Sequence, residues 1–244
     1  MRWPPAALSS AEAASGTDGS AVLLEGIELR KSFGPTLALD GAGLRLRAGE
    51  VVAVMGPSGS GKSTLLHCLA GILRPDSGRV TYRGTELTGL PDSSLSRLRR
   101  TEFGFVFQFG QLVPELTCLE NVALPLRLAG VRRKDAENRA TEWLARVEVG
   151  DVAGKRPGET SGGQEQRVAV ARALVSGPKV VFADEPTGAL DSLNGERVMR
   201  LLVDASKETN VGVLLVTHEP RVAAYSDREV VVRDGISREV ELAG

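Results

Sequence analysis

The chain has 244 residues, a formal net charge of −1 at pH 7, 42% hydrophobic residues and 25% charged residues. This composition is that of a globular protein large enough to bury a core in one large domain or two joined lobes. The near-zero charge excludes a general attraction to nucleic acid or acidic lipid, and no apolar run of about 18 residues is present for a spanning helix. We therefore expect no nucleic-acid partner.

The N-terminal segment differs from the rest. Residues 1–20 mix Pro, Ala, Ser and Gly with few large apolar groups, which predicts a disordered tail without the apolar core of a secretory signal. Residues 21–242 are expected to form the functional domain. Cys68 and Cys118 lack metal-ligand spacing, so we expect Cys68 to be a buried free thiol and the compartment to be a reducing cytoplasm.

Alternating apolar and polar residues predict an antiparallel β layer before residue 50. The pattern runs through residues 22–30, 36–39 and 43–47, and Phe33 with the two residues after it marks a turn. Phe33 lies at the edge of this layer. Its ring could stack on an adenine base or simply fill the core.

A glycine-rich octet, GPSGSGKS at residues 56–63, follows the apolar run Val51–Met55 and precedes a predicted helix. It fits the phosphate-binding pattern G-x-x-x-x-G-K-[ST], which an accidental turn would match in roughly 1% of chains of this length. Glycines let backbone N–H groups surround a polyphosphate, and the helix N-terminus adds a positive dipole end. Lys62 would contact the β- and γ-phosphates, and Ser63 would ligate Mg²⁺. The expected nucleoside triphosphate contacts are Gly56, Pro57, Ser58, Gly59, Ser60, Gly61, Lys62, Ser63 and Thr64.

Residues 92–175 are predicted to form a mostly helical lobe inserted between strands. The three- and four-residue spacing of apolar side chains predicts a helix over residues 134–147. Pro114 and Pro125 are expected to break helices.

Three apolar strands end in polar side chains, where open α/β sheets contact their ligands. These side chains are Gln108, the acidic pair Asp184 and Glu185, and His218. Asp184 would hold Mg²⁺ through water and Glu185 would polarise an attacking water, unless the pair is only a charged turn. His218 could hydrogen-bond a γ-phosphate or be structural. Two short strands about a turn at residues 234–235 are expected to finish the chain.

Taken together, these elements resemble the ATP-binding cassette of ABC transporters over residues 22–235. The distinguishing stretch is Ser161-Gly162-Gly163-Gln164 with the predicted helix behind it, which looks like the family signature. The resemblance implies a head-to-tail dimer, in which the signature loop of one copy closes on the γ-phosphate held by the other. A serine hydroxyl, glycine N–H groups and a helix N-terminus fit such a second anion site.

The same resemblance implies roles for single residues. Gln108 looks like the glutamine that senses Mg²⁺ and the attacking water, Glu185 like the catalytic base and His218 like the switch histidine. Thr160 replaces the usual leucine, which affects the tightness of closure more than the chemistry. The implied catalytic residues are Glu185, His218, Gln108 and Lys62; the metal-binding residues are Ser63, Gln108 and Asp184; further nucleotide contacts are Phe33, Gln108, Ser161, Gly162, Gly163, Gln164 and Asp191, the last in a dimer-crossing loop.

Within the family, FVFQ at residues 105–108 and EPTGALD at residues 185–191 look most like the bacterial lipoprotein-release and macrolide-export ATPases. The implied fold is α/β: a phosphate-loop NTPase core of mainly parallel sheet, an N-terminal antiparallel β layer and an inserted helical subdomain. The implied function is an ATP-hydrolysing motor using ATP and Mg²⁺ at the cytoplasmic face of the cell membrane. Its implied partners are an integral-membrane permease and a second ATP-binding subunit.

Other functions fit parts of the pattern. A phosphate-loop kinase or GTPase would share the octet but would have no use for the signature loop. A cell-division cassette, which signals through a permease without moving a substrate, would use identical motor chemistry. Co-purification with the permease, followed by a test for substrate movement, discriminates this cassette from a transport motor.

Overall fold

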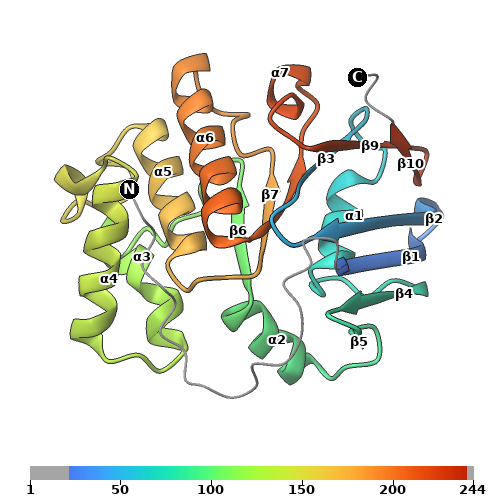
Figure 1. Ribbon diagram of the computed structural model, residues 1–244, viewed down its shortest axis with the longest axis horizontal. Coiled ribbons are helices and arrows are strands. Elements are labelled where there is room, and N and C mark those ends of the chain that lie inside the picture. The colour runs from blue at the N-terminus through green and yellow to red at the C-terminus, as the bar shows by residue number, and fades with distance from the viewer. Residues whose placement is uncertain (1–21, 241–244) are drawn as a thin grey trace.

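The computed structural model describes residues 22–240, so the predicted tail at residues 1–20 lies outside the described residues. Two β-sheets organise this part of the chain: a four-stranded sheet of order β2-β1-β4-β5 and a six-stranded sheet of order β10-β9-β3-β8-β7-β6. In Figure 1 helices α3, α4 and α5 lie to the left of the six-stranded sheet, and the four-stranded sheet lies at the right of the picture, below β9 and β10. The predicted α/β fold class is confirmed.

The four-stranded sheet is the predicted antiparallel layer, although its strands are longer than the pattern indicated. It consists of β1 (Val22–Phe33), β2 (Thr36–Arg47), β4 (Ser77–Tyr82) and β5 (Thr85–Glu86). The pairing of β1 with β2 contains several register shifts. Such irregularities absorb the residues that interrupt the alternation, so each strand continues where the sequence predicted a gap.

The six-stranded sheet is parallel from β9 to β6, and β10 pairs antiparallel with β9. Its strands are β3 (Val51–Met55), β6 (Phe103–Phe107), β7 (Val180–Asp184), β8 (Gly212–Val216), β9 (Arg228–Arg233) and β10 (Ile236–Val240). On β3, Val51 and Ala53 face one core, whereas Val52 and Val54 face the other. Burial on both faces explains why the central strands are continuous apolar runs.

The two cores place the first and fifth helices on opposite faces of the parallel sheet. Leu65 and Leu69 of α1 (Lys62–Leu69) belong to the core that also contains the antiparallel layer. Val168 and Val170 of α5 (Gly162–Leu174) belong to the other core, with residues of α3, α4 and α6. The phosphate loop and the signature loop, which precede these two helices, are therefore carried by different layers.

The remaining helices are α2 (Asp92–Thr101), α3 (Cys118–Leu128), α4 (Arg133–Arg146), the 3-10 turn η1 (Gly150–Val152), α6 (Ser192–Thr209) and α7 (Pro220–Ala223). The stretch 92–175 thus contains helices, but also β6, which belongs to the parallel sheet. The helix predicted over residues 134–147 corresponds to α4.

Pro125 was expected to break a helix, and this prediction is wrong, because α3 continues through it. An interior proline costs about 3 kcal/mol. Val122 and Leu126 are buried on the same helix, and each such side chain contributes roughly 1.5–3 kcal/mol. A capping box between Thr117 and Glu120 also fixes the helix start, so the cost is offset.

Helix α6 was not predicted from the sequence. Asp191 caps it by accepting a hydrogen bond from the backbone N–H of Asn194 at 2.9 Å. Its buried face contains Val198, Met199 and Leu202. The three- and four-residue spacing after an N-capping aspartate was the signal that could have found it.

Candidate nucleotide-binding site

The phosphate loop joins β3 to α1 and takes a shape that only glycine allows at two points. Gly56 and Gly61 have φ angles of 146° and 105°. A Cβ at Gly56 would collide with the carbonyl of Val232, and a Cβ at Gly61 would collide with the carbonyl of Ala38. The loop therefore needs glycine at these two points both for its positive φ angles and for its close packing against neighbouring backbone.

Lys62 places its ammonium group on this loop. Its side chain is buried, and Nζ donates hydrogen bonds to the carbonyls of Gly56 at 2.9 Å and Pro57 at 2.8 Å. The Ser60 hydroxyl beside it is buried without a protein partner. A cation, an unpaired hydroxyl and glycine backbone together fit a polyphosphate.

The start of α1 lies beside the end of β7. The hydroxyl of Ser63 donates to Oδ1 of Asp184 at 3.2 Å, and burial raises the pKa of the Asp184 carboxyl. Two oxygens at this spacing, one on a desolvated carboxylate, fit a hard divalent cation such as Mg²⁺. Among residues 22–240 no cluster of three or more His, Cys, Asp or Glu could hold a metal. Phosphate oxygens and water would therefore complete the shell.

Glu185 follows β7 and pairs with His218, which follows β8. Oε1 of Glu185 lies 2.7 Å from Nδ1 of His218, and the hydrogen bond and charge of Glu185 raise the pKa of His218. Glu185 has a φ of 49°, and its Oε2 is buried without a protein partner. One carboxylate oxygen is thus held, while the other is available to accept a proton.

Gln108 lies at the same edge of the sheet. It follows β6, where Phe107 pairs with Asp184 of β7. A Cβ on Gly188 would lie 2.8 Å from Nε2 of Gln108, so this amide lies against the loop after Glu185. The structure thus gathers Lys62, Ser63, Gln108, Asp184, Glu185 and His218 around the carboxyl ends of the parallel strands.

Phe33 lies at the tip of the β1–β2 hairpin and is 51% exposed. The ammonium of Lys31 lies 5.9 Å from its ring centroid. Because half of its surface is accessible, Phe33 is not a core filler. An exposed aromatic ring can stack on a base.

The signature stretch forms the N-terminus of α5. The Ser161 hydroxyl accepts from the backbone N–H of Gln164 at 3.3 Å, and the Gln164 side chain accepts from the backbone N–H of Ser161 at 3.0 Å. Ser161 and Gly162 are exposed, whereas Gly163 is buried. The helix start therefore presents a serine and glycine backbone outward.

Asn194 joins the signature to Asp191, a contact that the sequence analysis missed. A Cβ on Gly163 would lie 2.7 Å from Cγ of Asn194. Nδ2 of Asn194 donates to Oδ2 of Asp191 at 2.6 Å. The D-x-x-N spacing at the start of α6 was the available signal, because an aspartate N-cap bonds to the third residue of its helix.

Thr160 has a polar partner in place of apolar packing. Its hydroxyl donates to Oε1 of Glu165 at 3.3 Å, and the backbone N–H of Gly158 donates to the same oxygen at 2.8 Å. The loop before the signature is therefore tied to the first turn of α5.

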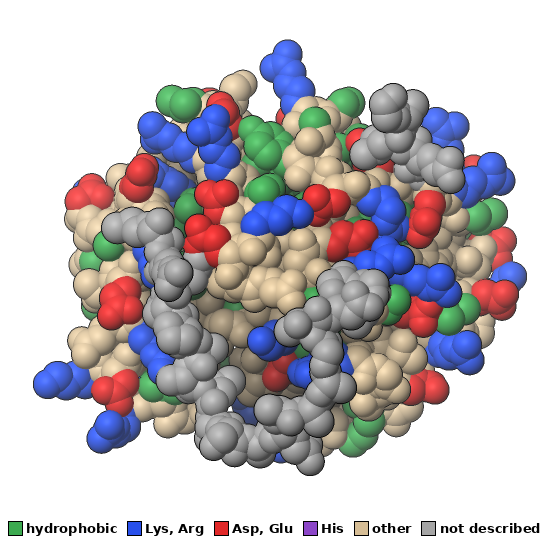
Figure 2. Space-filling view, in the orientation of Figure 1, with side chains coloured by type: hydrophobic (Ala, Val, Ile, Leu, Met, Phe, Trp, Pro, Cys, Tyr) green, Lys and Arg blue, Asp and Glu red, His purple; other side chains and the backbone are tan. Residues whose placement is uncertain are grey.

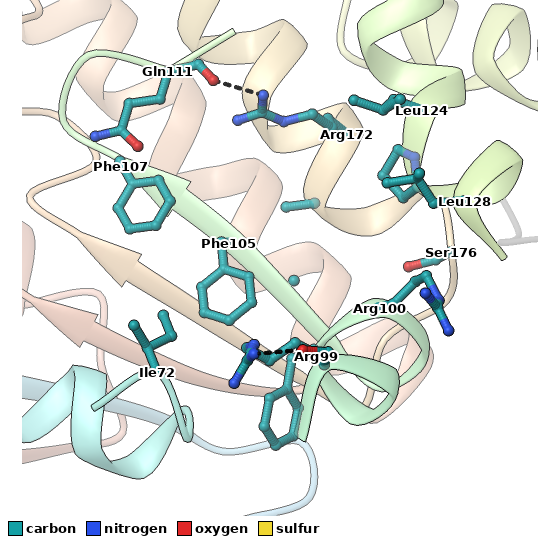
Figure 3. A pocket seen from close by; sticks show the side chains of 15 residues that line it. Ile72, Arg99, Arg100, Phe105, Phe107, Gln111, Leu124, Leu128, Arg172 and Ser176 are labelled. Carbon is teal, nitrogen blue, oxygen red and sulfur yellow. Dashed lines mark hydrogen bonds between the residues drawn. The ribbon is translucent and has the colours of Figure 1, made fainter. Parts of the chain in front are cut away.

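A groove of about 550 Å³ lies between β6 and helices α2, α3 and α5. Figure 3 shows Phe105 and Phe107 in this groove, with Leu124 and Leu128 on the α3 side. Arg172 of α5 donates to the carbonyl of Gln111 at 2.8 Å across it. The groove is thus apolar at its base and carries arginines along its sides.

Acidic and basic side chains are interspersed over the face shown in Figure 2, in keeping with the near-neutral net charge. None of the helices formed by residues 22–240 combines the length and apolarity needed to cross a bilayer. Cys68 and Cys118 are buried free thiols, which confirms the prediction for Cys68.

The phosphate loop after β3, the acidic end of β7 and the capped glycine pair at the start of α5 together define the class of protein as a phosphate-loop NTPase. Comparison with known proteins gives the family. The model "ABC transporter" matches residues 39–188, and the chain belongs to this family of ATP-binding subunits. It therefore binds and hydrolyses ATP as the motor subunit of an ABC transporter.

Several relatives are similar over nearly their full length. The chain is 47% identical over 204 residues to the lipoprotein-releasing system ATP-binding protein LolD 2 of Rhodopseudomonas palustris, covering 83% of this chain and 88% of that protein. It is 45% identical over 214 residues to LolD of Bacteroides thetaiotaomicron, covering 88% and 97%.

Solved structures of ATP-binding cassettes share the fold. The dimeric cassette MJ0796 bound to ADP and Pi has a TM-score of 0.85 and 39% sequence identity, covering 91% of this chain and all of that one. The cassette cbiO1 from Clostridium perfringens has a TM-score of 0.80 and 31% identity, covering 89% and 87%.

Proposed function

We propose that the chain powers a membrane exporter that extrudes a lipid, lipoprotein, peptide or antibiotic through a separate permease. The similarity to relatives named for lipoprotein release supports this cargo class. The same similarity favours export over the cell-division type of cassette. We place the chain at the cytoplasmic face of the membrane, held there by the permease.

In this proposal residues 56–64 hold the triphosphate, and Phe33 stacks on the base. The Lys62 ammonium, now on the loop carbonyls, turns to the β- and γ-phosphates. Mg²⁺, when bound, supplies charge stabilisation at the phosphate oxygens, and Ser63, Gln108 and Asp184 would hold it directly or through water.

Glu185 acts as the base toward the attacking water. Its Oε1 is held by His218, and its Oε2 is buried without a protein partner. Oε2 can therefore accept a hydrogen bond from the attacking water. His218 contacts the γ-phosphate with its other ring nitrogen. Gln108 orients the same water and couples the state of the site to the helical lobe.

The observation that carries the proposal is the separation of two anion sites in one chain. The phosphate loop belongs to α1 and the signature to α5, and these helices pack on opposite faces of the parallel sheet. The dimeric arrangement of the similar cassette MJ0796 supports completion of each site by a second copy. Ser161, Gly162, Gly163, Gln164 and Asp191 would then contact ATP held by the twin.

A mixing experiment tests this arrangement. Lys62→Ala and Ser161→Ala chains are each expected to have little ATPase activity, because both sites in each homodimer are defective. In a mixed dimer, one site combines an intact phosphate loop with an intact signature, so mixing should recover activity. A mixture no more active than its two components would contradict a site shared between copies.

The groove in Figure 3 is the surface that we assign to the permease. It adjoins residues 109–126, which carry motion from Gln108 to the helical lobe. Leu128 lines the groove and is 61% exposed. Co-purification of wild-type and Leu128→Ser chains from membranes tests this surface, with the permease expected only in the first. Movement of a lipoprotein or drug by that complex would separate export from signalling.

A further inference from the structure

Gln166 is a buried polar residue of α5, next in sequence to Arg167, which is also buried. It lies on α5, five residues after Ser161, and is 2% exposed. Its amide nitrogen Nε2 donates one hydrogen bond to the carbonyl of Phe107 at 2.8 Å and another to the carbonyl of Pro186 at 2.7 Å. Both amide protons are therefore used, each on a different segment of backbone.

These two carbonyls adjoin the reacting region. The carbonyl of Phe107 belongs to the peptide bond that leads into Gln108, and Pro186 directly follows Glu185. A single side-chain nitrogen thus bridges the backbone before Gln108 and the backbone after Glu185, just beyond the point where Phe107 of β6 pairs with Asp184 of β7. The contacts span 59 and 20 residues of sequence, so no local structure imposes them.

A second link from the same helix strengthens the first. The guanidinium of Arg172 donates to the carbonyls of Gly110 at 2.7 Å and Gln111 at 2.8 Å. Gln166 and Arg172 lie six positions apart on α5, so the helix holds both ends of the segment 107–111. Movement of α5 is therefore carried directly to the backbone around Gln108.

We propose that Gln166 is a positioning residue that aligns Gln108 with Glu185 and links closure of the signature helix to this alignment. The inference rests on the proposed roles of those two residues. Because α5 begins at the signature, a shift of Ser161 toward the twin's phosphate moves Gln166, about 7 Å further along a rigid helix. Through its two carbonyl contacts, Gln166 would then move Gln108, which orients the water, and Glu185, the base, into alignment at the same time.

The test uses the full chain with Gln166→Met, which keeps the length of the side chain but has no donor, and with Gln166→Glu, which places a carboxylate against two carbonyls. Both variants are expected to bind ATP within about twofold of wild type. Both should lower kcat by about tenfold to a hundredfold, because small misplacements of reacting groups have effects of this size.

Val168→Ala is the matched control, since Val168 is buried on the same helix but contacts neither loop through a side-chain hydrogen bond. It should lower Tm with little change in kcat. If Gln166→Met lowers kcat no more than Val168→Ala at an equal loss of Tm, Gln166 only supports the packing and the inference is overturned.

Two further variants remove the remaining ambiguity. If Gln166→Met does not fold, Gln166→Asn replaces it, because its shorter amide cannot reach both carbonyls; an unchanged kcat in that variant overturns the inference. Glu185→Gln is measured in the same series. If Glu185→Gln hydrolyses ATP at the wild-type rate, the proposed function is wrong. If Glu185→Gln is inactive but Gln166→Met is fully active, only the role of Gln166 is wrong.

Discussion

Within one chain, the phosphate loop is tied to its surroundings, whereas the signature loop presents exposed residues. Lys62 is buried and bonded to two loop carbonyls, and Ser63 contacts Asp184. Ser161 and Gly162 are exposed at the start of α5, and Ser161 is held by the capping box with Gln164 and by the backbone bond from Glu165. The two half-sites also belong to different layers of the fold.

This difference indicates how ATP can control association. In the dimer that we propose, the phosphate-loop half-site binds the nucleotide first, and the exposed signature half-site contacts that nucleotide only when a second copy arrives. Contacts of both half-sites with ATP would then stabilise the dimer, and hydrolysis would remove that stabilisation. Substitutions in the two halves should therefore differ in which step they change.

The largest expected effect comes from Glu185→Gln. This variant keeps the contacts of both half-sites, so ATP should bind and the dimer should form. Turnover should fall by about a hundredfold or more, because the base is removed. Phosphate release and size-exclusion chromatography with ATP measure the two properties. Glu196→Gln, on the exposed side of α6, should keep the wild-type rate; a full rate in Glu185→Gln would remove Glu185 from the mechanism.

The next largest effect distinguishes the halves directly. Lys62→Ala should weaken ATP binding by the single chain by about tenfold to a hundredfold, the usual size for a charged hydrogen bond. Ser161→Ala should leave that affinity unchanged and weaken only ATP-dependent dimerisation. Calorimetry at low protein concentration measures the binding, with the exposed Lys179→Ala as control. Equal losses of ATP affinity in the two variants would contradict the proposed difference between the phosphate-loop and signature half-sites.

A smaller effect is expected from two neighbouring glycines in the signature half. Gly163→Ala places a Cβ 2.7 Å from Asn194, whose amide is bonded to Asp191 and cannot easily move. Overpacking of this kind costs about 1–3 kcal/mol, which corresponds to a Tm lower by about 2–10 °C. Gly162→Ala meets nothing within 4 Å and should keep its Tm. Thermal unfolding of both variants checks this, and equal Tm values would be inconsistent with the contact.

The smallest effect is the pH dependence of the Glu185–His218 pair. Glu185 raises the pKa of His218 in the folded chain, so the pair stabilises fully below the unfolded value of about 6.5 and is lost as pH rises through the raised value. Because the His218 side chain is 60% exposed, solvent screens the effect. Tm of wild type minus Tm of His218→Gln should therefore decrease as the pH rises above about 6.5. A rise would reverse the sign and disprove the pairing.

Local sequence patterns predicted the elements that bear the phosphate loop and the strand-end side chains. The four apolar residues before Asp184 and the five before Gly56 suffice as a signal, because a parallel strand buried on both faces is a nearly continuous apolar run. The strand order β10-β9-β3-β8-β7-β6 was not predictable in this way, since pairing joins residues far apart in the chain. Pro125 was misjudged because tertiary packing of α3 outweighs a local preference.

The candidate site divides in the same manner. Lys62, Asp184 and Glu185 are visible in short motifs, because each stands at a fixed place relative to a strand end or a helix start. Gln166 and Asn194 act through contacts with residues that are distant in sequence or on another element. Gln166 looks like an ordinary polar residue on a helix until the fold brings its partners beside it, and the D-x-x-N spacing signals the bond of Asn194 to Asp191 but not its contact with Gly163.

Glu185 has a left-handed backbone conformation, with a φ of 49°. At this position the residue that would favour stability differs from the residue that the proposed activity needs. A side chain in that region costs about 1 kcal/mol relative to glycine. Selection for a more heat-resistant chain would therefore favour glycine there, and selection for ATP turnover would forbid it. Glycine at this position would relieve that backbone cost but would lose the bond to His218 and, in the mechanism that we propose, the base.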